Sequence, residues 1–145
     1  MMQKDNRTIA FVCTGNTCRS PMAEAIFNDM AEKNGVCVRA ESFGIATSTG
    51  LPVSENSVIV CKEIGIDLSG KASTAVADAG IEKYEKFYCM SQSHAKMLMQ
   101  FFLVQPEKIA VLGISDPYGG DIDVYRHCRD EIVNSVKEIL KAYEN

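Results

Sequence analysis

The strongest constraint on this chain is a short segment near its start, which reads FVCTGNTCRSP over residues 11–21. The apolar run at residues 9–12 is typical of a buried strand and ends at Cys13. Ser20-Pro21 is typical of a helix start, because serine caps a first turn and proline loses no hydrogen bond there. The order is therefore strand, tight loop and helix N-terminus. The N–H groups of such a loop and the helix dipole together form a site for an anion.

Two chemically active side chains bracket this loop. Cys13 lies at its entrance, where a helix N-terminus and nearby cations favour the thiolate, the nucleophilic form of cysteine. Arg19 lies at its exit and offers a planar fork that matches two oxygens of a phosphoryl group. We therefore expect a phosphate cradle with a sulfur nucleophile directed at phosphorus. A buried structural cysteine beside a solvated arginine is the simpler alternative.

Length and composition narrow the class of protein. A chain of 145 residues is expected to form a single domain over residues 1–145, and its net charge of −4 without a polybasic run argues against a nucleic-acid partner. No apolar run is long enough for a membrane, and residues 1–7 lack the apolar core of a signal peptide, so a cytoplasmic location is the default. The six cysteines are then expected to be reduced thiols. The two histidines lie far apart, so no metal site is predicted, and His94 is interpreted as a solvated or core residue.

Strand and helix patterns alternate along the chain. The patterns predict strands over residues 8–12, 36–42, 86–90 and 108–112, and helices over 21–34, 54–63, 74–83, from 91, and over 122–143. This alternation predicts an α/β fold with three layers, α/β/α, a four-stranded parallel sheet, and a phosphate-binding loop after the first strand. Ligands bind at the carboxyl ends of the strands in such sheets. The Cys13 loop and a loop at Asp116 both follow strands, so we expect them to face one pocket.

Two motifs resemble the low-molecular-weight protein tyrosine phosphatases. The run CTGNTCRSPMAEA, residues 13–25, is similar to the signature of that family, and SDPYGG, residues 115–120, is similar to its general-acid loop. The motifs lie near opposite ends of the chain, so the resemblance covers nearly all of it. It implies a phosphatase acting on phosphorylated proteins without a metal or other cofactor. In that reaction Cys13 is the nucleophile that forms phosphocysteine, Arg19 the phosphate clamp and Asp116 the general acid and base.

The resemblance also implies supporting roles for other residues. Asn16, a residue type that tolerates left-handed backbone geometry, braces the loop through Ser42, and Ser20 donates a hydrogen bond to the thiolate. Cys18 shares the loop with Cys13 and is expected to trap it as a reversible disulfide on oxidation. The residues expected to bind the phosphate or substrate are Thr14, Gly15, Asn16, Thr17, Cys18, Ser20 and Tyr118, the last of them lining the pocket wall.

Thr17 bears on the choice of substrate. Many tyrosine-specific relatives carry an isoleucine here that packs against the phenol ring. The bacterial protein-arginine phosphatase branch resembles this chain more closely, with threonine in the loop and a downstream motif similar to DPYGGDID, residues 116–123. A hydroxyl makes the pocket wall less favourable to an aromatic ring and able to hydrogen-bond. We therefore expect phosphoarginine as the substrate, with phosphotyrosine as the alternative.

Two further functions are compatible with the loop. Thiol-dependent arsenate reductases share the fold and a Cys-x5-Arg loop, but they relay the disulfide through a downstream pair of thiols. This chain has Cys89 in about that region and no second cysteine in the helix that follows. A phosphoprotein-binding module without catalysis would need Arg19 and the loop amides, but neither Cys13 nor Asp116.

Overall fold

The structure is a computed structural model that describes residues 7–144. Four parallel strands form its centre. The strands are β1 (Thr8–Cys13), β2 (Arg39–Gly44), β3 (Lys86–Cys89) and β4 (Ile109–Val111), in the spatial order β2-β1-β3-β4. β1 is central, and Ile9 to Val12 are fully buried because helices cover both faces of the sheet. The predicted four-stranded parallel sheet is confirmed. The prediction about a signal peptide concerns residues 1–7, of which residues 1–6 lie outside the described residues.

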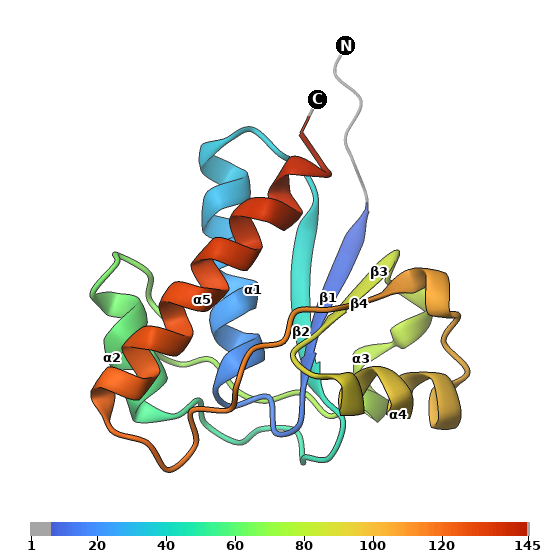
Figure 1. Cartoon of the computed structure of the whole chain (residues 1–145), viewed down its shortest axis with the longest axis horizontal. Coiled ribbons are helices and arrows are strands. Elements are labelled where there is room, and N and C mark those ends of the chain that lie inside the picture. Colours follow the sequence, from blue (N-terminus) through green and yellow to red (C-terminus); the bar gives the residue numbers. More distant parts are fainter. Residues whose placement is uncertain (1–6, 145) are drawn as a thin grey trace.

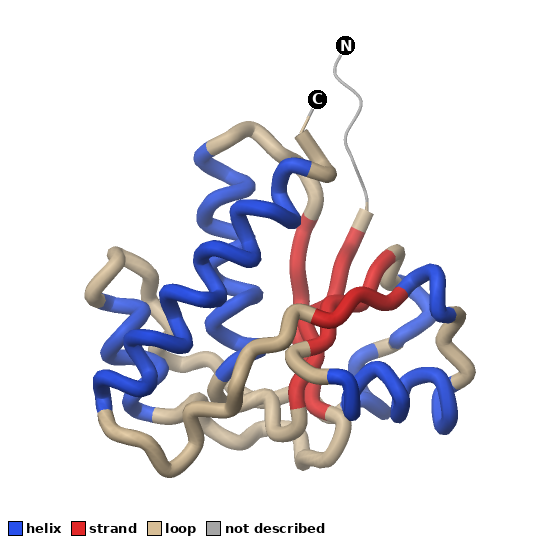
Figure 2. Tube along the Cα trace, in the orientation of Figure 1, coloured by secondary structure: helices blue, strands red, loops and turns tan. Residues whose placement is uncertain are grey.

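Helices form a layer on each side of this sheet (Figures 1 and 2). On one side lie α1 (Arg19–Lys33), α2 (Glu55–Lys62) and α5 (Ile122–Lys141). The other side carries α3 (Val76–Ala79), α4 (Gln92–Phe102) and the short 3-10 turn Ile81–Lys83; a second such turn, Pro106–Lys108, precedes β4. Each side has its own apolar cluster, and the predicted α/β/α layering is confirmed. None of the described helices is long and apolar enough to cross a membrane.

The two largest departures from the predicted elements occur at glycines. The second strand begins at Arg39 rather than at residue 36, because Gly35 adopts a φ of 69° and the Val36 N–H still bonds the carbonyl of Ala31 at the end of α1. The helix predicted over residues 74–83 is interrupted, because Gly80 is left-handed with a φ of 69°.

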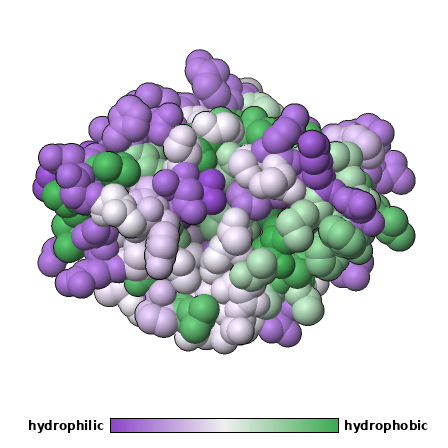
Figure 3. Space-filling model, turned by 60° about the horizontal axis from the view of Figure 1, so that its bottom comes forward, coloured by the Kyte–Doolittle hydropathy of each residue, from purple (hydrophilic) through white to green (hydrophobic). Residues whose placement is uncertain are grey.

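The carboxyl ends of the strands meet at one end of the molecule. Cys13, the last residue of β1, pairs with Gly44 at the end of β2, and Val12 pairs with Cys89 at the end of β3. Figure 3 brings this end forward, and the middle of the face is mostly white and pale, the colours of residues with intermediate hydropathy. The loops that leave these strand ends therefore surround a common surface of moderate polarity.

Candidate active site

A cavity of about 220 Å³ lies between the β1–α1 loop and the loop that precedes α5. Its lining consists of eight residues: Cys13, Thr14, Gly15, Thr17, Cys18, Arg19, Asp116 and Tyr118. The tertiary structure thus brings together two loops that are about one hundred residues apart, as expected from their places after parallel strands. A wider hollow of about 590 Å³ borders it and shares Thr17, Cys18 and Tyr118.

The buried side chain of Asn16 holds the loop in shape. Its backbone is left-handed, with a φ of 56°, which asparagine adopts at little cost. Its amide nitrogen donates to the hydroxyls of Ser20 (2.7 Å) and Ser42 (3.0 Å), and its amide oxygen accepts from the backbone N–H of Thr74 (2.7 Å). The expected contact with Ser42 is therefore present. One side chain ties the loop to α1, to β2 and to the segment before α3.

Two donors converge on the sulfur of Cys13. The backbone N–H of Asn16 lies 3.2 Å from Sγ, and the hydroxyl oxygen of Ser20 lies 2.8 Å from it. Because Ser20 already accepts a hydrogen bond from the Asn16 amide, its own proton is left for the sulfur. The expected contact between Ser20 and Cys13 is present, and this arrangement stabilises negative charge on the sulfur.

The helix that follows the loop begins earlier than predicted. α1 starts at Arg19, with Cys18 as the capping residue and no side chain bonded to the first-turn amides. Ser20 and Pro21 therefore lie inside the first turn, and the Ser20 hydroxyl contacts the Cys13 sulfur instead of acting as a cap. The amides of the first turn remain available to an anion in the cavity.

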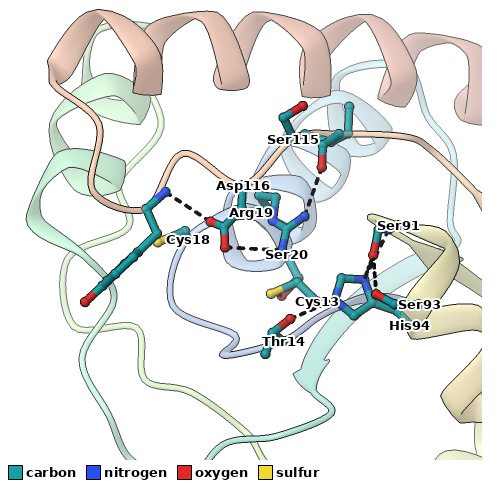
Figure 4. A network of polar contacts seen from close by, with 12 residues as sticks. Cys13, Thr14, Cys18, Arg19, Ser20, Ser91, Ser93, His94, Ser115 and Asp116 are labelled. Atoms are coloured by element: carbon teal, nitrogen blue, oxygen red, sulfur yellow. Dashed lines mark hydrogen bonds and ion pairs between the residues drawn. The ribbon is translucent and has the colours of Figure 1, made fainter.

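Arg19 and Asp116 approach each other across the cavity (Figure 4). The Arg19 guanidinium is buried, donates through Nη1 to the backbone carbonyl of Ile114 (2.9 Å), and places Nη2 3.7 Å from Oδ2 of Asp116. The Asp116 side chain is 54% exposed and accepts from the backbone N–H of Tyr118 (3.0 Å). Tyr118 is itself 83% exposed, so it borders the mouth of the cavity. A buried cation and a solvent-accessible carboxylate thus face one space.

A second layer of contacts, which the sequence did not predict, supports the Asn16 network. The Ser42 hydroxyl donates to Oε1 of Glu24 (2.6 Å), and Lys71 pairs with Oε2 of the same carboxylate (3.0 Å). A carboxylate can only accept, so Ser42 must donate to Glu24 and accept from Asn16. The signal available in the sequence was the four-residue spacing of Ser20 and Glu24, which places both on one face of α1.

His94 is a further residue whose place at the site was not predicted from the sequence. His94 is buried, in agreement with its interpretation as a core residue rather than a solvated one. Its ring also contacts the phosphate loop, with Nε2 2.9 Å from Oγ1 of Thr14. Burial and the positive charge of Arg19 lower the pKa of His94 to about 4, against a smaller opposing effect of Asp116. The sequence signal was Ser91-x-x-His94, which has the spacing of a helix capping box.

The remaining cysteines occupy different surroundings, and all six in the chain are free thiols. Cys18 lies 3.7 Å from the Tyr125 hydroxyl and borders the same cavity as Cys13. Cys89 is fully buried in the cluster on the α3 and α4 side of the sheet, and burial raises its pKa to about 12. Cys89 is therefore poorly suited to relay electrons from the cavity.

Known proteins resemble this chain over nearly its whole length. A protein-arginine-phosphatase of Geobacillus stearothermophilus is 35% identical over 145 residues, covering 94% of this chain and 95% of that protein. The crystal structure of a low molecular weight protein tyrosine phosphatase from T. tengcongensis superposes on it with a TM-score of 0.89 at 32% identity, covering 94% of this chain and 99% of that one. An arsenate reductase of Brevibacillus brevis is 30% identical over 141 residues, covering 97% of this chain and 99% of that protein.

The family model described as low molecular weight phosphotyrosine protein phosphatase matches residues 8–145. That match includes the Cys13 loop, the Asp116 loop and all four strands. The chain therefore belongs to the low molecular weight phosphotyrosine protein phosphatase family and is a cysteine-dependent protein phosphatase.

Proposed function

We propose that this phosphatase removes the phosphoryl group from phosphoarginine in proteins, through a phosphocysteine intermediate on Cys13. The observation that carries the proposal is the small cavity in which Cys13, Arg19, Asp116 and the hydroxyl-bearing Thr17 line one space. Further support comes from the Geobacillus stearothermophilus relative, whose name is protein-arginine-phosphatase.

The first step is attack of the Cys13 sulfur on phosphorus. A P–S bond forms as the P–N bond to the arginine breaks, and the electron pair of that bond leaves with the nitrogen. The loop N–H groups and Arg19 hold the three equatorial oxygens during this in-line transfer, in which positioning and electrostatics provide most of the catalysis. The Ser20 hydroxyl and the backbone N–H of Asn16, both directed at Sγ, stabilise the thiolate before attack and when it is released.

Asp116 handles the protons of both steps. Its exposed carboxyl group, on the loop across the cavity from Cys13, protonates the leaving guanidine nitrogen. The resulting carboxylate then takes a proton from water, which attacks the phosphocysteine. Orthophosphate leaves, the thiolate is regenerated and Asp116 is protonated for the next cycle. The protons therefore balance without a further acid or base.

Thr17 is the residue that we assign to leaving-group choice. It lines both the small cavity and the wider hollow beside it, so the atoms just beyond the phosphoryl group pass it. Within the described residues its hydroxyl has only a long contact, 4.0 Å, with the Cys18 sulfur. That hydroxyl can accept an N–H of a guanidine, whereas a phenol ring would need an apolar surface at this position.

Two substitutions separate the hydroxyl from the shape of Thr17. Thr17→Val removes the hydroxyl at almost constant volume, and Thr17→Ile adds an apolar arm; all three residues are β-branched, so the loop backbone is disturbed little. We expect both variants to lower kcat/KM for phosphoarginine by roughly 10- to 200-fold, and Thr17→Ile to preserve or raise it for phosphotyrosine. Parallel losses on both substrates would assign Thr17 to loop geometry alone. A wild-type protein active on phosphotyrosine and inert to phosphoarginine would overturn the proposal.

Arsenate reduction is the alternative that the Brevibacillus brevis relative raises. That chemistry needs an accessible thiol to accept the disulfide from Cys13, and Cys89 is fully buried with a pKa raised to about 12. Turnover of arsenate with a dithiol, measured beside phosphoarginine, distinguishes the two. Arsenate turnover that is faster than phosphatase turnover and lost in Cys89→Ser would favour the reductase.

A further inference from the structure

The contact between His94 and Thr14 joins α4 to the phosphate loop (Figure 4). We infer that His94 is a positioning residue that turns the Thr14 hydroxyl into a hydrogen-bond donor for a phosphate oxygen. The inference rests on the proposed use of this cavity as a phosphate cradle, and it adds a side-chain donor to the loop amides and Arg19.

The surroundings of His94 determine which ring nitrogen carries the proton. His94 occupies the first turn of α4, where the backbone N–H of Ser91 donates to Nδ1 at 3.1 Å and the Ser91 hydroxyl lies 3.0 Å from the same atom. An atom that accepts from a backbone N–H cannot carry a proton, so Nδ1 is bare. In the neutral ring the proton is therefore on Nε2.

The Nε2 proton in turn determines the role of the Thr14 hydroxyl. Oγ1 of Thr14 lies 2.9 Å from Nε2, so it must accept that hydrogen bond. A hydroxyl that accepts from one neighbour keeps its single proton for a second acceptor. Thr14 is solvent-exposed and lines the cavity together with Cys13 and Arg19. A phosphoryl oxygen, which is an acceptor only, is the chemical partner that this free proton fits.

The charge state of the ring supports this arrangement. His94 is 3% exposed, and burial together with Arg19 opposes a second proton on the ring. A proton on Nδ1 would also oppose the backbone N–H of Ser91, so the capping contact itself selects the neutral form. The direction of the hydrogen bonds from Ser91 to His94 to Thr14 is thus set from the helix end toward the cavity.

Inorganic phosphate tests the inference without an assumption about the leaving group. Orthophosphate is used as a competitive inhibitor of para-nitrophenyl phosphate hydrolysis by wild type, Thr14→Val, His94→Leu and the double variant. We expect Thr14→Val to weaken orthophosphate inhibition about tenfold, because it removes a hydrogen bond to a charged group. His94→Leu should weaken it by up to the same factor, because the Thr14 hydroxyl loses the contact that orients its proton. Orthophosphate should inhibit the double variant as strongly as it inhibits Thr14→Val. Because the bond is made equally before and during transfer, KM should rise while kcat changes little.

His94→Gln is the matched control. Glutamine at this capping-box position can accept from the Ser91 N–H through Oε1 and donate to Thr14 through Nε2, so orthophosphate inhibition should remain near that of wild type. Unaltered inhibition in Thr14→Val would overturn the inference, and so would multiplying effects in the double variant. Thr14→Val changes an exposed residue, so this outcome does not depend on whether His94→Leu folds. Failure to hydrolyse phosphoarginine would instead refute only the proposed substrate.

Discussion

Gly44, at the end of β2, lies against the phosphate loop. A Cβ placed on Gly44 would lie 2.7 Å from the backbone carbonyl oxygen of Thr14, 3.0 Å from the carbonyl carbon of Gly15 and 2.7 Å from the methyl group of Thr47. The φ of Gly44 is outside the left-handed region, so alanine can adopt the backbone conformation and the effect of Gly44→Ala is steric. An ordinary contact begins at 3.4 Å, so the loop must move by about 0.7 Å.

A displacement of this size acts on the residues that hold the phosphate. A shift of ~1 Å in a catalytic group can cost on the order of 100-fold in rate, so we expect Gly44→Ala to lower kcat/KM by roughly 10- to 100-fold. Overpacking of this kind typically lowers the free energy of unfolding by ~1–3 kcal/mol. The assays are hydrolysis of para-nitrophenyl phosphate and urea denaturation of the same preparation.

The double variant Gly44→Ala/Thr47→Ser separates the two contacts. Serine removes the Thr47 methyl group, which relieves the side-chain overlap, while the overlap with the Thr14 carbonyl remains. We expect the double variant to have a higher free energy of unfolding than Gly44→Ala, but an activity as low as that of Gly44→Ala. Full activity in Gly44→Ala, or its full recovery in the double variant, would refute the inference that loop displacement causes the defect.

Three further predictions concern protons and oxidation. Asp116→Asn should lower kcat/KM by about 100-fold or more for phosphoarginine, and much less for an activated aryl phosphate that leaves without a proton. Mild peroxide should oxidise Cys13 to a sulfenic acid, and the Cys18 thiol should condense with it to give a disulfide and water. After longer exposure to peroxide, a dithiol should then restore the activity of the wild type but not that of Cys18→Ser. The pKa of His94 falls from 6.5 to about 4 on folding. As the pH drops from 6.5 to 4, the unfolded chain therefore becomes protonated at His94 while the folded protein stays neutral there. The free energy of unfolding should fall by up to about 3 kcal/mol over this range.

Each of these predictions has a contradicting result. Equal losses on both classes of substrate would remove Asp116 from the role of acid. Equally reversible inactivation of Cys18→Ser, with no linked peptide in wild type, would refute the protective disulfide. The pH prediction is tested by urea denaturation of wild type and His94→Gln, with His127→Gln as the control because His127 is exposed on α5. A pH dependence that persists unchanged in His94→Gln would show that other groups cause it.

The fold was largely predictable because its signals are local. The apolar run at residues 9–12 identifies a strand buried on both faces, and alternating strand and helix patterns imply a parallel sheet with helices on each side. The largest errors occurred at Gly35 and Gly80, where a left-handed residue ends or breaks an element. A glycine alone does not reveal which conformation it will adopt, because it populates positive and negative φ about equally.

The sequence by itself identified all eight residues that line the cavity, because the nucleophile, the guanidinium and the carboxylate are chemically specific residues in loops and helix starts that follow strands. It also assigned Asn16 and Ser20 to phosphate binding, but these two are fully buried and support the loop instead. Only the tertiary structure decided how those residues are supported. His94 and Thr14 are 80 positions apart, and Lys71 and Glu24 are 47 apart, so no local pattern links them. Their contacts arise because β1, β2 and β3 pair in parallel and bring the following segments to one edge of the sheet. Hydrogen-bond direction, which points the proton of Ser20 at the Cys13 sulfur and leaves that of Thr14 available at the cavity, depends on that packing and on no single stretch of sequence.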